Sequence, residues 1–339
     1  MNREKFWKEG LTLSFILGSL FLADVLVGSV NIPFNEALSA LIGQSTAFSD
    51  IILQFRLPKA MTCVFAGGAL ATGGLLMQTL FRNPLAGPDV LGLSSGSSLM
   101  VAILIFVSQS NAGLSLLFFN NPWSIALGAS IGGGIIFILI IAIAQYIKDN
   151  TSLLIIGLMV SAVTSSIVSV LQFIGKAEDL QTFMIWTLGN VGSTSWNELK
   201  VMTVILSAGV AIAYFSSKSL NIWLLGENYA QGLGMKVARS RFWIVVSTGL
   251  LTGAVTAFCG PITFVGLAVP HLVRLVVHTT NHKILIPAVI CGGSSLLLLC
   301  DLISQLPGST QILPLNAVTS LIGAPIVIWV IIKSKPVRV

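Results

Sequence analysis

Few residues in this sequence have the types and spacing that chemistry requires. His271, His278 and His282 follow one another at i, i+7 and i+11, which permits metal binding but is more typical of imidazoles at a membrane boundary. The segment 175–178 reads GKAE and lacks both the upstream glycine and the hydroxyl of a phosphate-binding loop. No nucleophile is paired with a base. The sequence therefore predicts a chain that is not an enzyme and that carries no metal or cofactor of its own.

Two acidic residues, Asp24 and Asp301, fall inside apolar segments, where an ionisable side chain marks a functional site by default. Both lie toward the ends of their segments, so we favour the interpretation that they extend to water. A carrier coupled to a proton or sodium gradient is expected to have an acid or base near the middle of the membrane. The apolar segments show none, which weighs against ion coupling.

Two other segments carry a polar stripe at helical spacing. The first consists of Gly157, Ser161, Ser165 and Ser169, with Thr164 beside them, and the second of Asn316, Thr319, Ser320 and Gly323. Such a stripe faces either a neighbouring helix or a water-filled path, because lipid would leave the hydroxyls without partners. From spacing alone, helix packing is favoured.

These side chains must be positioned by membrane-spanning helices. Of 339 residues, 55% are hydrophobic and 9% are charged, whereas a soluble domain has about 25% charged residues. Apolar runs near 20 residues, the length that crosses a bilayer, recur along the chain. We therefore expect an all-α polytopic membrane protein, a single transmembrane domain over 1–339. The ten expected spans are 11–30, 59–81, 91–109, 122–146, 152–174, 197–216, 241–259, 262–277, 284–304 and 313–332.

The basic residues predict the orientation of the chain in the membrane, since cytoplasmic loops are enriched in lysine and arginine. An even number of spans places both termini on one side. The loops on that side, with the termini, hold fourteen of the eighteen basic residues, and the other loops hold only Arg56, Lys59, Lys176 and Lys200. Both termini are therefore expected in the cytoplasm.

The largest loop on the cytoplasmic side covers approximately 217–240. It has an amphipathic pattern in Trp223, Leu224, Tyr229 and Leu233. Such a loop is either a helix on the membrane surface or a docking element for a soluble partner. Elsewhere, Gly92 with Gly96, Gly128 with Gly132 and Gly249 with Gly253 form GxxxG pairs, which predict closely packed helices.

Six blocks of the sequence, in order along the chain, together resemble the FecCD family of permeases from iron–siderophore, haem and cobalamin ABC importers. They are FRLPKA (55–60), GGALATGGLLMQTLFRNPLAGPDVLGLSSGSS (67–98), WTLGNVGSTSW (186–196), LGENYAQGLG (225–234), GPITFVGLAVPHLVRL (260–275) and LPLNAVTSLIGAPIVIWV (313–330). The resemblance implies the permease fold of a type II ABC importer. It also implies a homodimer in a bacterial inner membrane that shares one translocation path. Two separate ATPase subunits would bind ATP and Mg²⁺ inside, and a substrate-binding protein would dock outside.

The resemblance also assigns roles to individual residues. It favours pore lining for both polar stripes, namely Gly157, Ser161, Thr164, Ser165, Ser169, Asn316, Thr319 and Ser320. A cytoplasmic gate is expected at Asn83, Leu85, Thr151 and Ser152. The ATPase-coupling loop is expected at Gly226, Glu227, Ala230 and Gly234. Docking of the binding protein is expected at Arg56, Lys59 and Gln305. Relatives commonly have arginine where this chain has Gln305 and glutamate where it has Ile312, so its outer surface is expected to be less charged.

The function implied by the resemblance is import of an iron(III) chelate such as a siderophore, with cobalamin or haem as alternatives. An ion-coupled secondary transporter stays open as a function of another class. Substrate movement down an ion gradient without any ATPase would favour that alternative.

Overall fold

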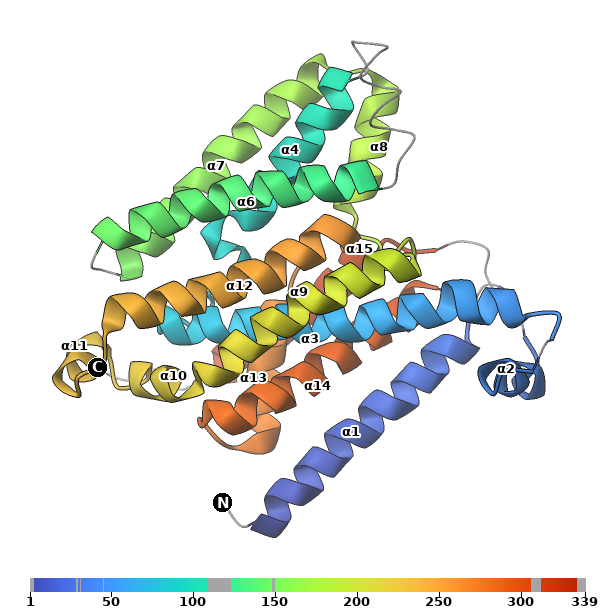
Figure 1. Ribbon diagram of the computed structural model, residues 1–339, viewed down its shortest axis with the longest axis horizontal. Helices are drawn as coiled ribbons and strands as arrows, with labels where there is room; N and C mark the ends of the chain where they lie inside the picture. The colour runs from blue at the N-terminus through green and yellow to red at the C-terminus, as the bar shows by residue number, and fades with distance from the viewer. Residues whose placement is uncertain are drawn as a thin grey trace.

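The computed structural model of the protein describes residues 3–28, 30, 32–44, 46–108, 123–147, 150–305 and 312–333, and all regular secondary structure in these ranges is helical (Figure 1). A helix occurs at each of the ten expected spans. They are α1 Arg3–Leu26, α3 Leu57–Leu80, α4 Leu93–Ser108, α6 Trp123–Tyr146, α7 Asn150–Ile174, α9 Trp196–Phe215, α12 Val237–Cys259, α13 Val265–Val277, α14 His282–Ser304 and α15 Leu315–Lys333. Among the described residues, seven helices are long and apolar enough to cross a membrane, whereas α4, α13 and α15 contain shorter apolar stretches.

Several short helices lie between these long ones. They are α2 Phe34–Leu41, the π-helix η1 Ile51–Arg56, the 3₁₀-helix η2 Pro88–Leu91, α8 Ala177–Thr187, α10 Ser217–Trp223 and α11 Glu227–Gly232. Only those of the 217–240 loop, α10 and α11, fall where the sequence suggested a short helix. Their lengths lie well below the roughly 20 residues that a membrane crossing needs, so hydropathy alone does not reveal them. The first helix also begins and ends earlier than expected, at Arg3 and Leu26.

Helix α3 is the centre of the bundle, and 83% of its apolar stretch is buried. Close approach by its neighbours is possible because glycine and alanine line its faces. A Cβ atom on Gly74 would overlap the carbonyl oxygen of Gly266 in α13, and one on Gly67 would overlap that of Gly293 in α14. Small residues at such crossings let helix backbones touch in lipid.

The sequence-based expectation that GxxxG glycines mark close packing is confirmed at most positions. Helices α4 and α6 cross at Gly96 and Gly132, where a Cβ on Gly96 would lie 2.7 Å from the Gly132 carbonyl oxygen. Gly92 meets Ser161, Gly128 meets Leu104 and Gly249 meets Phe137. Gly253 is the exception, since a Cβ there would meet no atom within 4 Å.

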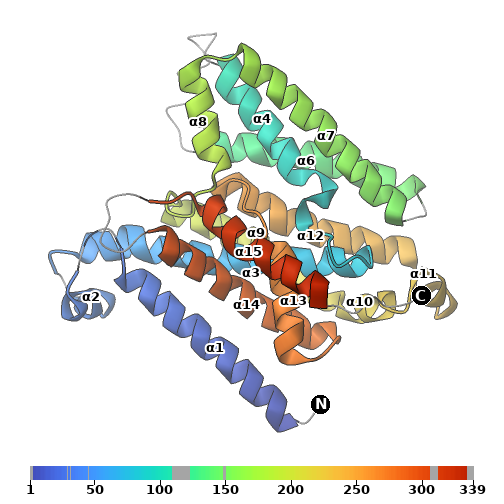
Figure 2. The ribbon, with the colours of Figure 1, turned by 180° about the vertical axis from the view of Figure 1, so that it is seen from behind.

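The helices fall into two groups that α12 connects. Helices α4, α6, α7 and α8 form one group, which lies at the top of both views (Figures 1 and 2). The other group surrounds α3 and includes α1, α9, α13, α14 and α15. Helix α12 packs against α4 and α6 on one side and against α3 and α9 on the other.

The contrast between Gly74 and Gly253 yields a matched pair of variants. We expect Gly74→Ala to lower the free energy of unfolding by about 1–3 kcal/mol, because the new methyl group must push α13 away from α3. Gly253→Ala should not lower the free energy of unfolding and can raise it by up to about 1 kcal/mol, because alanine has the higher helix propensity. Thermal unfolding in detergent measures both, and equal stability of the two variants would contradict the packing described for α3.

Candidate functional site

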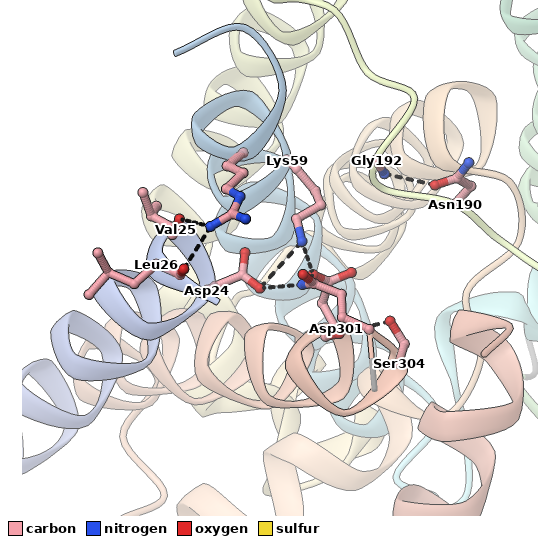
Figure 3. Close-up of polar contacts among 10 residues, drawn as sticks. Asp24, Val25, Leu26, Lys59, Asn190, Gly192, Asp301 and Ser304 are labelled. Atoms are coloured by element: carbon pink, nitrogen blue, oxygen red, sulfur yellow. Dashed lines mark hydrogen bonds and ion pairs between the residues drawn. The ribbon is translucent and has the colours of Figure 1, made fainter. Parts of the chain in front are cut away.

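An ion-pair cluster ties α1, α3 and α14 together at one end of the bundle. Asp24, Lys59 and Asp301 point toward one another from these three helices (Figure 3). The Lys59 Nζ atom lies 2.6 Å from Asp301 Oδ2 and 3.6 Å from Asp24 Oδ1. Gln305 Nε2 donates to the same two oxygens, at 2.6 Å and 3.1 Å. We call these four residues the outer cluster, after the side of the membrane that the distribution of basic residues predicts for them.

Both acidic side chains are buried, which corrects the expectation that they extend to water. The side chain of Asp24 is completely buried and that of Asp301 is 7% exposed, and both contact the Lys59 ammonium and the Gln305 amide within the protein, although Asp24 Oδ2 has no hydrogen-bond partner. Asp301 and Gln305 are one helical turn apart in α14, which is a signal that the sequence contained. The pairing with Asp24 and Lys59 is a tertiary contact that spacing could not reveal.

Arg56 lies beside the cluster and caps the C-terminus of α1. Its guanidinium donates to the carbonyl oxygens of Val25 at 3.2 Å, Leu26 at 2.6 Å and Val30. A cation at a helix C-terminus satisfies unpaired carbonyl groups and complements the helix dipole. The side chain is buried, so its charge stabilises the contact between the end of α1 and η1, which leads directly into α3.

The three predicted docking residues are therefore brought together. Arg56, Lys59 and Gln305 line one cavity of about 260 Å³, and Asn190 and Ile312 line it as well. The charges of Arg56 and Lys59 are already engaged by groups of this chain. The metal-type grouping of Asp24, Cys63 and Asp301, whose ligand atoms lie within 4.8 Å of one another, includes both carboxylates that contact the Lys59 ammonium.

The predicted gate residues lie in two separate segments. Asn83 Oδ1 accepts a hydrogen bond of 2.9 Å from the backbone N–H of Leu85, which shapes the turn after α3 and leaves the Leu85 side chain 48% exposed. His271 Nε2 contacts the carbonyl oxygen of Pro84 at 2.8 Å and holds this turn against α13. In the first turns of α7, Thr151 is exposed and Ser152 is half-buried.

The polar stripe of α7 divides into a packed part and an exposed part. Gly157 and Thr164 are buried, and the Ser161 hydroxyl lies 3.0 Å from the position of a Cβ on Gly92, at the start of α4. Ser165 and Ser169 are exposed. Their hydroxyl groups sit on a side of α7 that no other described helix covers.

The polar stripe of α15 holds neighbouring segments together. Asn316 Nδ2 donates to the carbonyl oxygens of Thr187 at 2.9 Å and Pro261 at 2.6 Å, and its Oδ1 accepts from the Thr263 backbone at 3.1 Å. Thr319 is buried, and the Ser320 hydroxyl lies 3.3 Å from that of Thr263. These contacts join α15 to the end of α8 and to the turn between α12 and α13.

The loop expected to couple to an ATPase contains α10, α11 and the first turn of α12. Gly226 and Gly234, with φ of +100° and +77°, bracket α11 in conformations that favour glycine. Ala230 and the side chain of Trp223 are fully buried. Tyr229 is 70% exposed and Leu233 is 61% exposed. The loop therefore presents apolar side chains from a fixed base.

Polar contacts fix this segment to the bundle. Glu227 Oε1 accepts from Arg241 Nη2 at 3.0 Å, and Arg241 Nη1 donates to the carbonyl oxygen of Ile147 at the end of α6 at 2.7 Å. The Trp223 indole donates to the Ser240 hydroxyl at 2.9 Å. Glu227, predicted only as part of the coupling loop, thus also anchors α11 to α12.

Comparison with known proteins identifies this arrangement of helices. The sequence profile of the FecCD transport family matches residues 15–333. The chain is 32% identical over 332 residues to the hemin transport system permease protein HmuU of Yersinia pestis, covering 97% of both chains. It is 33% identical over 336 residues to the vitamin B12 import system permease protein BtuC of Klebsiella pneumoniae, covering 98% of this chain and 96% of the other.

A solved structure has the same fold. An inward-facing conformation of a metal-chelate type ABC transporter superposes with a TM-score of 0.83 and 28% sequence identity, covering 96% of this chain and 99% of that one. The protein is thus a multi-pass helical membrane protein with the fold of an ABC transporter permease. It belongs to the FecCD transport family. The relatives are permease subunits, which confirms that the chain is a transport component rather than an enzyme.

The outer cluster gives a direct test of its electrostatics. We expect Lys59→Met to lower the free energy of unfolding by about 3–5 kcal/mol, because it leaves two buried carboxylates without their ammonium partner. Adding Asp24→Asn and Asp301→Asn to that variant removes the charges and should restore most of the loss. Thermal unfolding in detergent is the measurement, and wild-type stability of Lys59→Met alone would show that Lys59 does not stabilise the two buried carboxylates.

Proposed function

We propose that this chain is the membrane subunit of an ATP-driven importer and acts as one transmembrane domain in a homodimer. Two separate ATPase subunits would seat on the 217–240 segment and would hold the ATP and Mg²⁺. A substrate-binding protein would dock at the cavity lined by Arg56, Lys59 and Gln305. The observation that carries the proposal is the exposure of Tyr229 and Leu233 on a short helix that is anchored to the bundle. Exposed apolar side chains on a fixed base are suited to a protein partner.

The orientation follows from the charges. The 217–240 segment and both termini belong to the basic set of loops, which we place in the cytoplasm of a bacterial cell. The outer cluster then faces the extracytoplasmic side. ATP-driven closure of the ATPase dimer would move α10 and α11 and rock the paired permeases between inward-open and outward-open states.

The translocation path is assigned to the α7 faces of the two subunits. Ser165 and Ser169 would line it directly, because they are exposed on one side of α7. Gly157, Ser161 and Thr164 would support that surface from the contact with α4. Asn316, Thr319 and Ser320 would set the position of α15 beside the path. Asn83 and Leu85, with Thr151 and Ser152 on α7, would form the inner gate.

The proposed substrate is an iron(III) chelate such as a siderophore, with haem or cobalamin as the alternatives. Support comes from the relatives, which are described for hemin and for vitamin B12, and from the metal-chelate type transporter of the same fold. All three concern a metal ion enclosed in a large organic ligand. Hydroxyl groups without fixed charges on α7 suit such a ligand, which must slide through the path rather than be held.

The test is uptake by proteoliposomes that contain this chain and its ATPase, with the binding protein loaded outside. We expect accumulation of the chelate only with ATP inside. Leu233→Asp should abolish ATP-driven uptake and ATPase binding by placing a carboxylate in an apolar contact, whereas Leu233→Met should retain both. Uptake without the ATPase, driven by an ion gradient, would instead show a secondary transporter.

A further inference from the structure

A basic cavity of about 510 Å³ lies where α9 ends, between α10 and the start of α12, and is lined in part by the 217–240 segment, although none of the residues predicted for ATPase coupling lines it. We call it the basic pocket. Its polar lining includes Lys236, Arg239, Ser216 and Ser219, and its apolar lining includes Phe215 and Trp243. In Figure 1, α9 runs down into α10 beside the beginning of α12.

The basic pocket has an unbalanced positive charge. No aspartate or glutamate lines it. Lys236 and Arg239 are exposed, and within the part of the chain that the structure describes neither side chain forms an ion pair with a carboxylate. Two cations and two hydroxyl groups around one cavity are complementary to an anion with several acceptor oxygens, such as a phosphate ester.

The basic pocket also lies at the boundary of the membrane. The apolar stretch of α9 ends at Phe215, and that of α12 begins at Val237. Aromatic side chains are exposed at this level: Tyr214 packs beside Phe215, and Phe242 packs edge-on to Trp243. Aromatic residues concentrate at the depth of lipid headgroups. An anion bound here would therefore sit at headgroup level.

A second cavity lies along α9 in the hydrocarbon region, and its lining meets that of the basic pocket at Phe215. This acyl groove, of about 550 Å³, lies between α3, α9 and α14 and is lined by apolar side chains such as Phe65, Leu206, Val210 and Ile290. Phe215 lines both cavities. From Phe215 to Leu206, nine residues of helix span about 13 Å, which is close to half the thickness of the hydrocarbon core, about 15 Å.

We propose that the basic pocket and the acyl groove together form a binding site for an anionic phospholipid. Lys236 and Arg239 bind the phosphate, the hydroxyl groups of Ser216 and Ser219 donate to its oxygens, and one acyl chain passes Phe215 into the groove. The lipid comes from the leaflet on the basic side of the protein. Because the site packs against α10, the bound lipid would also hold the base of the 217–240 segment.

The experiment titrates the purified full-length chain in detergent with phosphatidylglycerol and with phosphatidylcholine of the same acyl chains, and follows binding by native mass spectrometry. We expect selective binding of phosphatidylglycerol. Lys236→Ala/Arg239→Ala should weaken its apparent affinity at least about 10-fold, since each basic group near a lipid surface contributes to binding. Lys176→Ala/Lys200→Ala removes two exposed positive charges that line neither cavity and belong to the loops of the opposite side, and should leave the affinity within about twofold.

A groove variant tests the acyl part separately. Val210→Trp should weaken binding of long-chain phosphatidylglycerol while leaving binding of a short-chain analogue unchanged, because it fills the groove and not the pocket. Equal binding of the two lipid classes by the wild-type chain would overturn the proposal, as would an equal loss in the control pair. Retained lipid binding with lost ATPase binding in Lys236→Ala/Arg239→Ala would assign the pocket to a protein contact instead.

Discussion

Helices inside a bilayer gain no hydrophobic free energy by leaving lipid for one another, so close backbone contact has to hold them together. In this protein that contact is concentrated on α3, where Gly67 faces α14 and Gly74 faces α13 with no room for a methyl group. Dispersion forces between backbones at such short range replace the missing hydrophobic term. The positions of α13, α14 and the ion-pair cluster depend directly on how these helices pack against α3, and α12 links α3 to the group that holds α7.

Both ends of α3, which the distribution of basic residues predicts to be its outer and inner ends, carry polar groups of the predicted sites. Its outer end supplies Lys59 to the carboxylates of α1 and α14. Its inner end leads into the turn of Asn83 and Leu85, and the Arg82 guanidinium there lies 3.2 Å from the position of a Cβ on Gly226. One helix thus connects the predicted docking cavity to the predicted coupling segment. A rigid connection of this kind suits a transporter whose two ends must respond together.

The sequence allowed prediction of the ten long helices, since each long apolar run has few alternatives in a membrane. It also predicted the packing role of most GxxxG glycines. The burial of the Asp24 and Asp301 side chains could not be predicted, because it depends on contact with Lys59, which is more than thirty residues away from either in the chain. The stripe of α7 is a similar case. Spacing identified Ser161 and Ser165 alike, but only the position of α4 separates the packed hydroxyl from the exposed one.

The central claim is that the exposed hydroxyl face of α7 meets water inside a shared path. Cysteine accessibility in proteoliposomes of the assembled importer, with the four native cysteines replaced by alanine, tests it most directly. A charged thiosulfonate should label Ser165→Cys and Ser169→Cys, and it should not label Val163→Cys, which is exposed on the opposite side of the helix. If none of the three positions reacts, α7 faces lipid or protein there, and the assignment of the path to α7 is contradicted.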